Sequence, residues 1–257
     1  FTGDDLWDGA DDSVSNWIAV GNSSEVASAG CIKLTAGEGD SASAIYLRDS
    51  SDLTADLVVG RNYQVSYDSA GDIVGSSQQL KAYTTGYINA SSTTTVTNVV
   101  GNGNMDSSGT WTEVPGSGAI NRTGSVKHNG THSYYIQTVG GNTSYIYQTI
   151  TGLSANTKYL FTYWSKNANA SASGDIRAKV YDNNNSEGLA LNGNTSYVAS
   201  GNETTDWVQF AGQFTTGSGN TSINLIFLSP TGNYLAYVDD VVISAFETNT
   251  IDFTASH

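Results

Sequence analysis

The chain has 257 residues, of which 28 are glycine and only 2 are proline, and its formal net charge is −14. Only 10 residues are Lys or Arg, which argues against nucleic-acid binding, because the neutralisation of phosphates needs clustered cations. The 15 Tyr and 5 Trp recur at strand spacing, which excludes a disordered chain. No apolar run approaches the roughly 20 residues of a membrane-spanning helix, so we expect no membrane insertion. The composition predicts an all-β protein of short strands joined by polar turns.

The first hundred residues begin with an acidic stretch and continue as strands separated by glycines. The acidic stretch at residues 4–12 lacks the ligand spacing of a helix–loop–helix calcium loop. Cys31 is the only cysteine, which excludes an intrachain disulfide. We expect strands at residues 31–35, 42–47, 61–68, 79–88 and 94–100.

A boundary near residues 98–103 introduces a second, longer unit. Its expected strands lie at residues 99–105, 110–114, 133–138, 144–150, 158–166, 175–182, 207–215, 222–228 and 235–244. The pattern predicts two tandem β-sandwich domains, a smaller or incomplete one at 1–100 and a second at 101–247. Residues 248–257 then form a tail or start a further strand. Two alternatives stay open for the first domain: it is a smaller sandwich, or strands after Glu247 complete it.

Residues 145–166 contain the strongest strand pattern, which we interpret as two strands joined in a hairpin. Side chains alternate along a strand, so Tyr159, Phe161 and Tyr163 share one face and Trp164 points to the other. We predict that the first three rings lie in the core and that Trp164 is exposed.

Five motifs follow one another along the second unit. They are NGNMD at 102–106, NGTHSY at 129–134, YLFTYW at 159–164, WVQF at 207–210 and YVDDV at 237–241. In this order they resemble the motifs of jelly-roll carbohydrate-binding modules of the group with families 4, 9 and 22, which have a galactose-binding-like fold. The sequence departs from that pattern at Asn104, Met105 and Asp106, where the family has Asp, Phe and Glu. Residues 57–67 resemble β-sandwich units of bacteriophage tail and decoration proteins.

This resemblance implies a structural calcium ion that bridges the first and last strands of the second domain. Asp106 matches the opening carboxylate, and Asp239 or Asp240 matches the closing one. A hard cation needs several oxygen ligands, which carboxylates and turn carbonyls supply. Strand alternation does not choose between Asp239 and Asp240. In the alternative interpretation, both side chains bind loop amides or face water.

Sugar binding needs flat aromatic faces flanked by polar groups. Trp164 is the leading candidate for a ligand platform, and the other candidates are Arg177, Tyr181, Gln148 and Tyr135. In the alternative interpretation, these side chains cover the sheets without binding a ligand. We assign Trp111 and Trp207 to the core.

The sequence contains no arrangement typical of an enzyme. His128 and His132 are four residues apart, but Asn129-Gly130 between them argues against a helical metal site. We therefore predict a non-catalytic glycan-binding or adhesion protein, with an oligosaccharide or polysaccharide as its partner, in an extracellular location or on a virion surface. The alternative is a structural virion component, such as a decoration, tail or fibre protein, or a subunit of an extracellular filament or layer. That alternative implies other surface proteins as partners, and a homo-oligomer is compatible with both.

Overall fold

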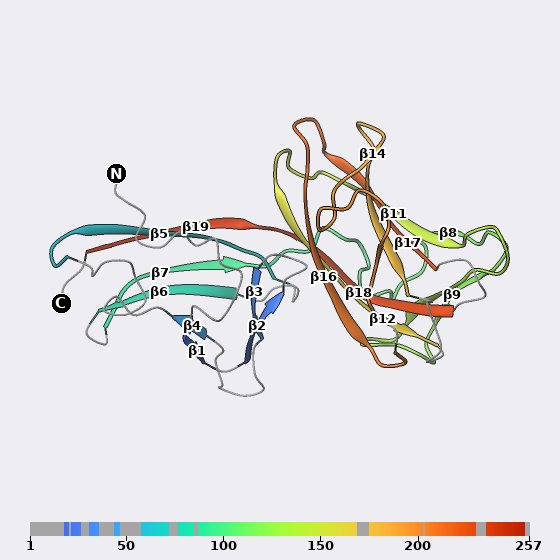
Figure 1. Ribbon diagram of the computed structural model, residues 1–257, viewed down its shortest axis with the longest axis horizontal. Coiled ribbons are helices and arrows are strands. Elements are labelled where there is room, and N and C mark those ends of the chain that lie inside the picture. Colours follow the sequence, from blue (N-terminus) through green and yellow to red (C-terminus); the bar gives the residue numbers. More distant parts are fainter. Residues whose placement is uncertain are drawn as a thin grey trace. The chain divides into compact units, whose positions relative to one another are not determined.

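The structure is a computed structural model (Figure 1) that describes residues 18–20, 22–26, 31–35, 44–46, 58–71, 77–84, 87–168, 175–202, 204–229 and 235–254. Every helix or strand assigned within these residues is a β-strand, which confirms the all-β prediction. None of the described segments forms a helix that could cross a membrane. The acidic stretch at residues 4–12 lies outside the described residues.

The chain divides into two compact units, and the first is discontinuous in sequence. Unit 1 contains Phe1–Ser69, Ser77–Thr94 and Thr248–His257, and unit 2 contains Ala70–Ser76 and Thr95–Glu247. The last strand, β19 (Glu247–Thr254), pairs with β5 (Asn62–Ser69). The second unit is therefore inserted between two parts of the first.

The other described strands of the first unit also form two-stranded pairs. These are β1 (Ile18–Val20) with β4 (Ala44–Tyr46), β2 (Asn22–Val26) with β3 (Cys31–Thr35), and β6 (Ser77–Thr84) with β7 (Tyr87–Thr95). The single strand predicted at residues 79–88 is wrong, because β6 and β7 divide this stretch between them.

The second unit is a β-sandwich of two antiparallel sheets, as the sequence predicted. The five-stranded sheet has the order β16 (Val208–Thr215), β12 (Lys158–Asn167), β18 (Leu235–Ala245), β10 (Ser133–Gln137) and β9 (Ala119–Thr123). The six-stranded sheet has the order β14 (Glu187–Gly188), β13 (Arg177–Asp182), β17 (Ser222–Leu228), β11 (Tyr145–Thr151) and β8 (Thr112–Val114), and β15 (Val198–Ala199) also pairs with β13.

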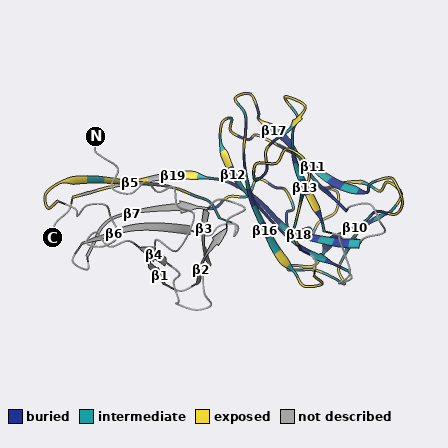
Figure 2. Ribbon diagram, viewed as in Figure 1, coloured by how far each residue is buried: buried dark blue, intermediate teal, exposed yellow. Residues whose placement is uncertain are grey.

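Alternate side chains of the two sheets meet in the core, which Figure 2 shows as buried segments inside the second unit. Tyr159, Phe161 and Tyr163 of β12 are buried, which confirms the prediction for these three rings. The Tyr163 and Phe161 rings lie 4.9 and 5.9 Å from the ring of Phe227, which belongs to the opposite sheet. Aromatic packing between the sheets therefore stabilises the sandwich.

The hairpin predicted at residues 145–166 is wrong, although both of its strands exist. β11 pairs with β17 and β8, whereas β12 pairs with β16 and β18 in the other sheet. The connection between them packs into the structure: Leu153 is buried, and its amide donates to the Thr221 carbonyl at 3.2 Å. The chain crosses from one sheet to the other here, so β11 and β12 present their outward side chains on opposite sides of the sandwich.

The strand predicted at residues 99–105 is also wrong, because this segment is a loop tied to β18. Asn102 and Met105 have positive φ angles of 48° and 57°. The Gly103 carbonyl accepts a hydrogen bond from the Val241 amide at 2.8 Å. A β-carbon at Gly103 would lie 2.0 Å from the Val241 carbonyl oxygen, so this close approach requires glycine.

Candidate functional site

The outer face of the six-stranded sheet carries rows of aromatic and polar side chains. Directly paired residues of antiparallel strands point to the same side, so the registers define three outward rows. The rows are Val114–Tyr145–Leu228–Arg177, Thr112–Tyr147–Ile226–Lys179 and Thr149–Asn224–Tyr181. The intervening residues of β13, Ala178 and Val180, are buried in the core. We call the surface with Tyr145, Tyr147, Tyr181, Tyr197, Arg177 and Lys179 the tyrosine face.

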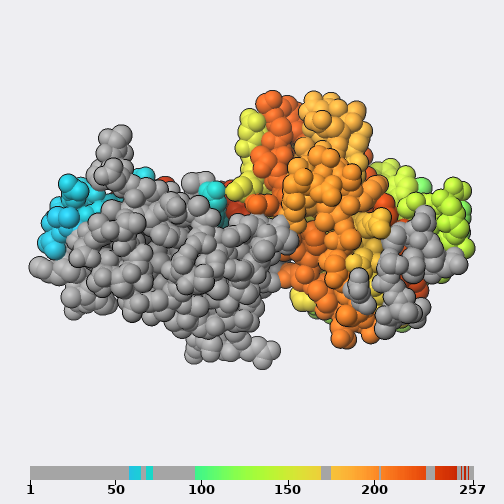
Figure 3. Space-filling view, in the orientation of Figure 1, coloured from blue at the N-terminus to red at the C-terminus, as the bar shows by residue number. Residues whose placement is uncertain are grey.

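Contacts between its side chains hold the tyrosine face together. The Tyr145 and Tyr147 ring centroids are 6.3 Å apart. Lys179 Nζ lies 5.4 Å from the ring centroid of Tyr181 and 5.5 Å from that of Tyr197, within the range of cation–π attraction. Figure 3 shows that orange-coloured parts of the chain form much of the surface of the second unit on the viewer's side, and these parts include β16 of the five-stranded sheet.

Polar groups border the rings on the same face. Thr149 Oγ1 donates to Asn224 Oδ1 at 2.7 Å, and the Asn183 side-chain amide donates to the same oxygen at 3.1 Å. Arg177 is exposed. This face therefore offers flat rings together with hydroxyl, amide and cationic groups.

The outer face of the five-stranded sheet presents a different arrangement around His128. The imidazole stacks on the Trp164 ring at 3.9 Å between centroids and 14° between planes. Its other contacts are an edge-on approach to Trp207 at 5.7 Å and a 2.6 Å contact from Nδ1 to Asp240 Oδ2. We call these four residues the His128 cluster. Because the imidazole covers one face of Trp164, that face is closed to a ligand.

The structure divides the five residues predicted to bind sugar among three surroundings. Arg177 and Tyr181 lie on the tyrosine face, and Trp164 and Tyr135 lie on the five-stranded sheet. Tyr135 accepts a hydrogen bond from Asn121 at 2.9 Å. Gln148 points inward and is buried, where its amide binds both the N–H and the carbonyl of Gly101, at 2.9 and 2.8 Å.

Sequence reasoning missed several residues of the two faces. Tyr145, Tyr147 and Tyr197 were not singled out, although the alternation along 145–151 places both Tyr145 and Tyr147 opposite the buried Ile146. Trp111 is buried, which confirms its assignment to the core. Trp207 is only partly buried and contacts His128 and Lys166, so its assignment to the core is wrong.

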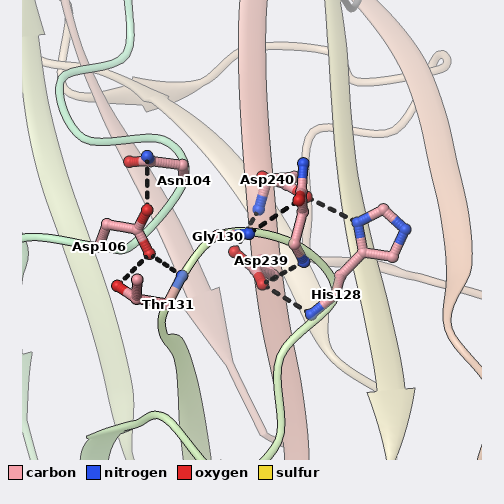
Figure 4. A network of polar contacts seen from close by, with 8 residues as sticks. Asn104, Asp106, His128, Gly130, Thr131, Asp239 and Asp240 are labelled. Atoms are coloured by element: carbon pink, nitrogen blue, oxygen red, sulfur yellow. Dashed lines mark hydrogen bonds and ion pairs between the residues drawn. The ribbon is translucent and has the colours of Figure 1, made fainter.

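The carboxylates predicted to hold calcium are bound by N–H and O–H donors (Figure 4). Asp106 Oδ1 accepts from the Thr131 amide and hydroxyl at 2.6 and 2.8 Å and from the His132 amide at 2.9 Å. Asp239 Oδ2 accepts from the His128 amide at 2.9 Å, and Oδ1 accepts from the Asp240 amide at 2.8 Å. Gly130, with φ +60°, turns the chain against Asp106, and a β-carbon there would lie 2.5 Å from Asp106 Oδ2.

In this structure the carboxylate oxygens of Asp106 and Asp239 accept hydrogen bonds from loop donors. In the described part of the chain, no three His, Cys, Asp or Glu side chains are grouped to hold a metal. The arrangement instead corresponds to the alternative in which the carboxylates bind loop amides. Calcium stays a prediction from the resemblance.

Asp106 and Asp239 differ in their electrostatic surroundings. The pKa of Asp106 is lowered, chiefly by the Thr131 amide and then by the Thr131 hydroxyl, because these donors stabilise the carboxylate. The pKa of Asp239 is raised to about 7, chiefly because burial disfavours its charged form; the His128 amide opposes this shift and the Asp240 carboxylate adds to it.

The outward rows of the tyrosine face contain no carboxylate.

A comparison with known families identifies residues 97–233 as matching the family described as "Carbohydrate binding domain". No match was found among curated proteins.

Several solved structures are similar to this chain. The "Family 16 Carbohydrate Binding Module-2" has 19% identity and a TM-score of 0.42, with 57% of this chain and 99% of that chain covered. The CBM22-1 xylan-binding domain of Paenibacillus barcinonensis Xyn10C has 18% identity and a TM-score of 0.39, with 56% and 92% covered. The enzymatically active domain of bacteriophage CBA120 tailspike protein 4 has 16% identity and a TM-score of 0.43, with 58% of this chain and 21% of that chain covered.

Proposed function

Because the chain belongs to the carbohydrate-binding domain family, we propose that its second unit binds an oligosaccharide or polysaccharide on the tyrosine face, without cleaving it. The observation that carries this proposal is the set of outward rows in which Tyr145, Tyr147 and Tyr181 stand beside polar and cationic side chains. Fold alone does not fix function, so the proposal depends on these side chains as well as on the family.

The chemistry of the face suits a sugar ring. An aromatic ring offers a flat apolar surface with a negative π face, against which the C–H groups of a pyranose pack. Thr149 and Asn224 provide hydroxyl and amide groups near the rings for the sugar hydroxyls. The rings of β11 lie on a strand that is paired on both sides, with β17 and β8, so its backbone holds them in a fixed row.

Trp164 is the less suitable platform in this structure. Its ring stacks on His128, and Asp240 holds the imidazole in place. A sugar would have to displace this imidazole in order to use that face of the indole.

The location of the protein follows from the sequence-based prediction. We propose that it acts at an outer surface, in an extracellular location or on a virion, where a module of this kind would attach its carrier to a glycan. Other surface proteins as partners belong to the alternative, in which the protein is a structural component of a virion or of an extracellular layer.

A panel of immobilised polysaccharides, read by surface plasmon resonance, tests the glycan-binding proposal. We expect that Tyr147→Ala and Tyr181→Ala each weaken binding about tenfold, because each removes a stacking surface. Trp164→Ala and Tyr135→Ala, on the opposite sheet, are the matched controls and should bind like the parent chain. Absence of binding to every glycan would refute the function, and a loss confined to Trp164→Ala would move the site to the five-stranded sheet.

A further inference from the structure

We propose that the glycan bound by the tyrosine face is acidic, with carboxylate or sulfate groups that pair with Arg177 and Lys179; this inference rests on the proposed function. Both cations are on β13, two residues apart, and therefore point to the same side of the sheet. They are opposite Leu228 and Ile226 of the neighbouring strand, so the cations adjoin an apolar strip.

The balance of charge on this face is opposite to that of the whole chain. The chain has 24 Asp and Glu against 10 Lys and Arg. None of the outward positions in the three rows is Asp or Glu, whereas two are cationic. A protein of net charge −14 would repel a polyanion, so a local cationic surface free of carboxylates is what an acidic ligand requires.

Neither cation is neutralised by a carboxylate in the part of the chain that the structure describes. Within the described residues, the His128 Nδ1 contact with Asp240 Oδ2, at 2.6 Å, is on the other sheet and involves neither cation. Lys179 instead lies between the rings of Tyr181 and Tyr197, which attract its charge without neutralising it. A cation held in this way keeps its capacity to bind an anion.

The geometry also places the charges beside the rings that would stack on sugar. A uronic acid carries its carboxylate on the edge of the pyranose ring, so a sugar stacked on a tyrosine directs its carboxylate sideways. Lys179 contacts two of the rings, and exposed Arg177 extends the cationic strip along β13. The planar guanidinium can bind a carboxylate or sulfate through two parallel hydrogen bonds.

The experiment compares acidic polysaccharides with neutral counterparts of the same backbone. Polygalacturonate, alginate and hyaluronan are each immobilised beside their carboxyl-reduced forms, and heparin is added as a sulfated probe. Neutral xylan and β-glucan complete the set. Affinity is measured by surface plasmon resonance at 0.05 and 0.5 M NaCl for the full chain.

We expect at least one acidic polymer to bind about tenfold more tightly than its reduced or neutral counterpart at low salt, with most of this preference lost at high salt. Arg177→Gln and Lys179→Gln should each weaken acidic binding about tenfold. Lys127→Gln is the matched control, since Lys127 is an exposed cation outside this face. Melting curves of the variants should coincide with that of the parent chain.

The two proposals fail in different ways. If neutral polymers bind as tightly as acidic ones, and Tyr147→Ala abolishes that binding while the glutamine variants do not affect it, the acidic ligand is refuted and the glycan-binding function stands. If no polymer of the set binds, both are refuted. If Lys127→Gln weakens binding as much as Lys179→Gln, the attraction is not specific to the tyrosine face and the inference is overturned.

Discussion

The two outer faces of the second unit differ in the side chains that contact their aromatic rings. On the six-stranded sheet, tyrosines contact one another and Lys179, and the outward rows contain no carboxylate. On the five-stranded sheet, Trp164 is stacked on an imidazole that itself contacts Asp240, next to the buried Asp239. On the first face, the Tyr145 and Tyr147 rings contact each other at a tilt, and Lys179 lies over Tyr181 and Tyr197. On the second face, the Trp164 ring is stacked on an imidazole of the protein. An aromatic residue at an outward strand position is therefore a candidate for binding only when its ring face is uncovered.

The largest expected effect comes from disrupting the contact between the loop at residues 99–105 and β18, the strand that contains Asp240. Gly103→Ala places a β-carbon 2.0 Å from the Val241 carbonyl oxygen, a backbone atom that cannot move away without displacing β18. We expect the free energy of unfolding of the second unit to fall by about 3 kcal/mol. Urea denaturation followed by tryptophan fluorescence measures this change.

Gly101→Ala, in the same loop, is the matched control. Its β-carbon would meet Thr110 Cγ2 at 3.3 Å and Gln148 Oε1 at 3.6 Å, both of which are side-chain atoms. We expect a change below about 1 kcal/mol there. Equal losses for the two variants would show that the contact between Gly103 and β18 is not what stabilises this region.

The second effect is a pH dependence of stability between pH 4 and pH 8 that comes from Asp239 in the five-stranded sheet. A carboxyl whose pKa is raised on folding is protonated in the folded state and ionised in the unfolded state between the two pKa values. The pKa of Asp239 in the folded state is about 7. We therefore expect the contribution of Asp239 to the free energy of unfolding to be highest below about pH 4, where Asp239 is protonated in both states, and to decrease as the pH rises from about 4 to about 7.

Comparison of Asp239→Asn with the parent chain isolates this contribution. Urea denaturation at several values between pH 4 and pH 8 should give a flatter profile for the variant, whatever its absolute stability. Asp206→Asn, at an exposed carboxylate, should keep the profile of the parent chain. A variant profile parallel to that of the parent chain would contradict the raised pKa of Asp239.

Strand alternation predicted the faces of individual strands well, because a buried face leaves a repeat of two in the sequence. The core rings of β12 were predicted on this basis. Alternation does not indicate which strands pair. Two strand patterns separated by a short turn therefore predict a hairpin even where the chain crosses from one sheet to the other. Because the strand pairing was not known, Trp164 and Tyr181 were both predicted to bind the sugar, although their strands lie in different sheets.

The contacts of His128 that cover one face of the Trp164 ring could not be predicted, because the residues involved are far apart in the sequence. His128 lies in the turn before β10 and Trp164 on β12, and Asp240 has a positive φ of 47° in β18. The register between β12 and β18 shifts between Thr162 and Trp164. A β-bulge of this kind changes which side chains face outward, so strict alternation fails at Asp239 and Asp240.

The smallest expected effect comes from uncovering Trp164, and it tests the comparison of the two faces most directly. His128→Ala removes the stacked ring and the contact with Asp240, which should lower the free energy of unfolding by about 1 kcal/mol. Acrylamide should then quench tryptophan fluorescence more strongly. Glycan binding should stay at the level of the parent chain, because the tyrosine face is on the other sheet.

His132→Ala is the matched control for this experiment. The His132 ring contacts the Thr131 hydroxyl at 2.9 Å through Nδ1, so the variant loses a neighbouring imidazole from the same turn. We expect its quenching to equal that of the parent chain. If His128→Ala gains glycan affinity and His132→Ala does not, the freed indole itself stacks on sugar. In that case both sheets would carry binding surfaces, and His128 would be the group that blocks the second one.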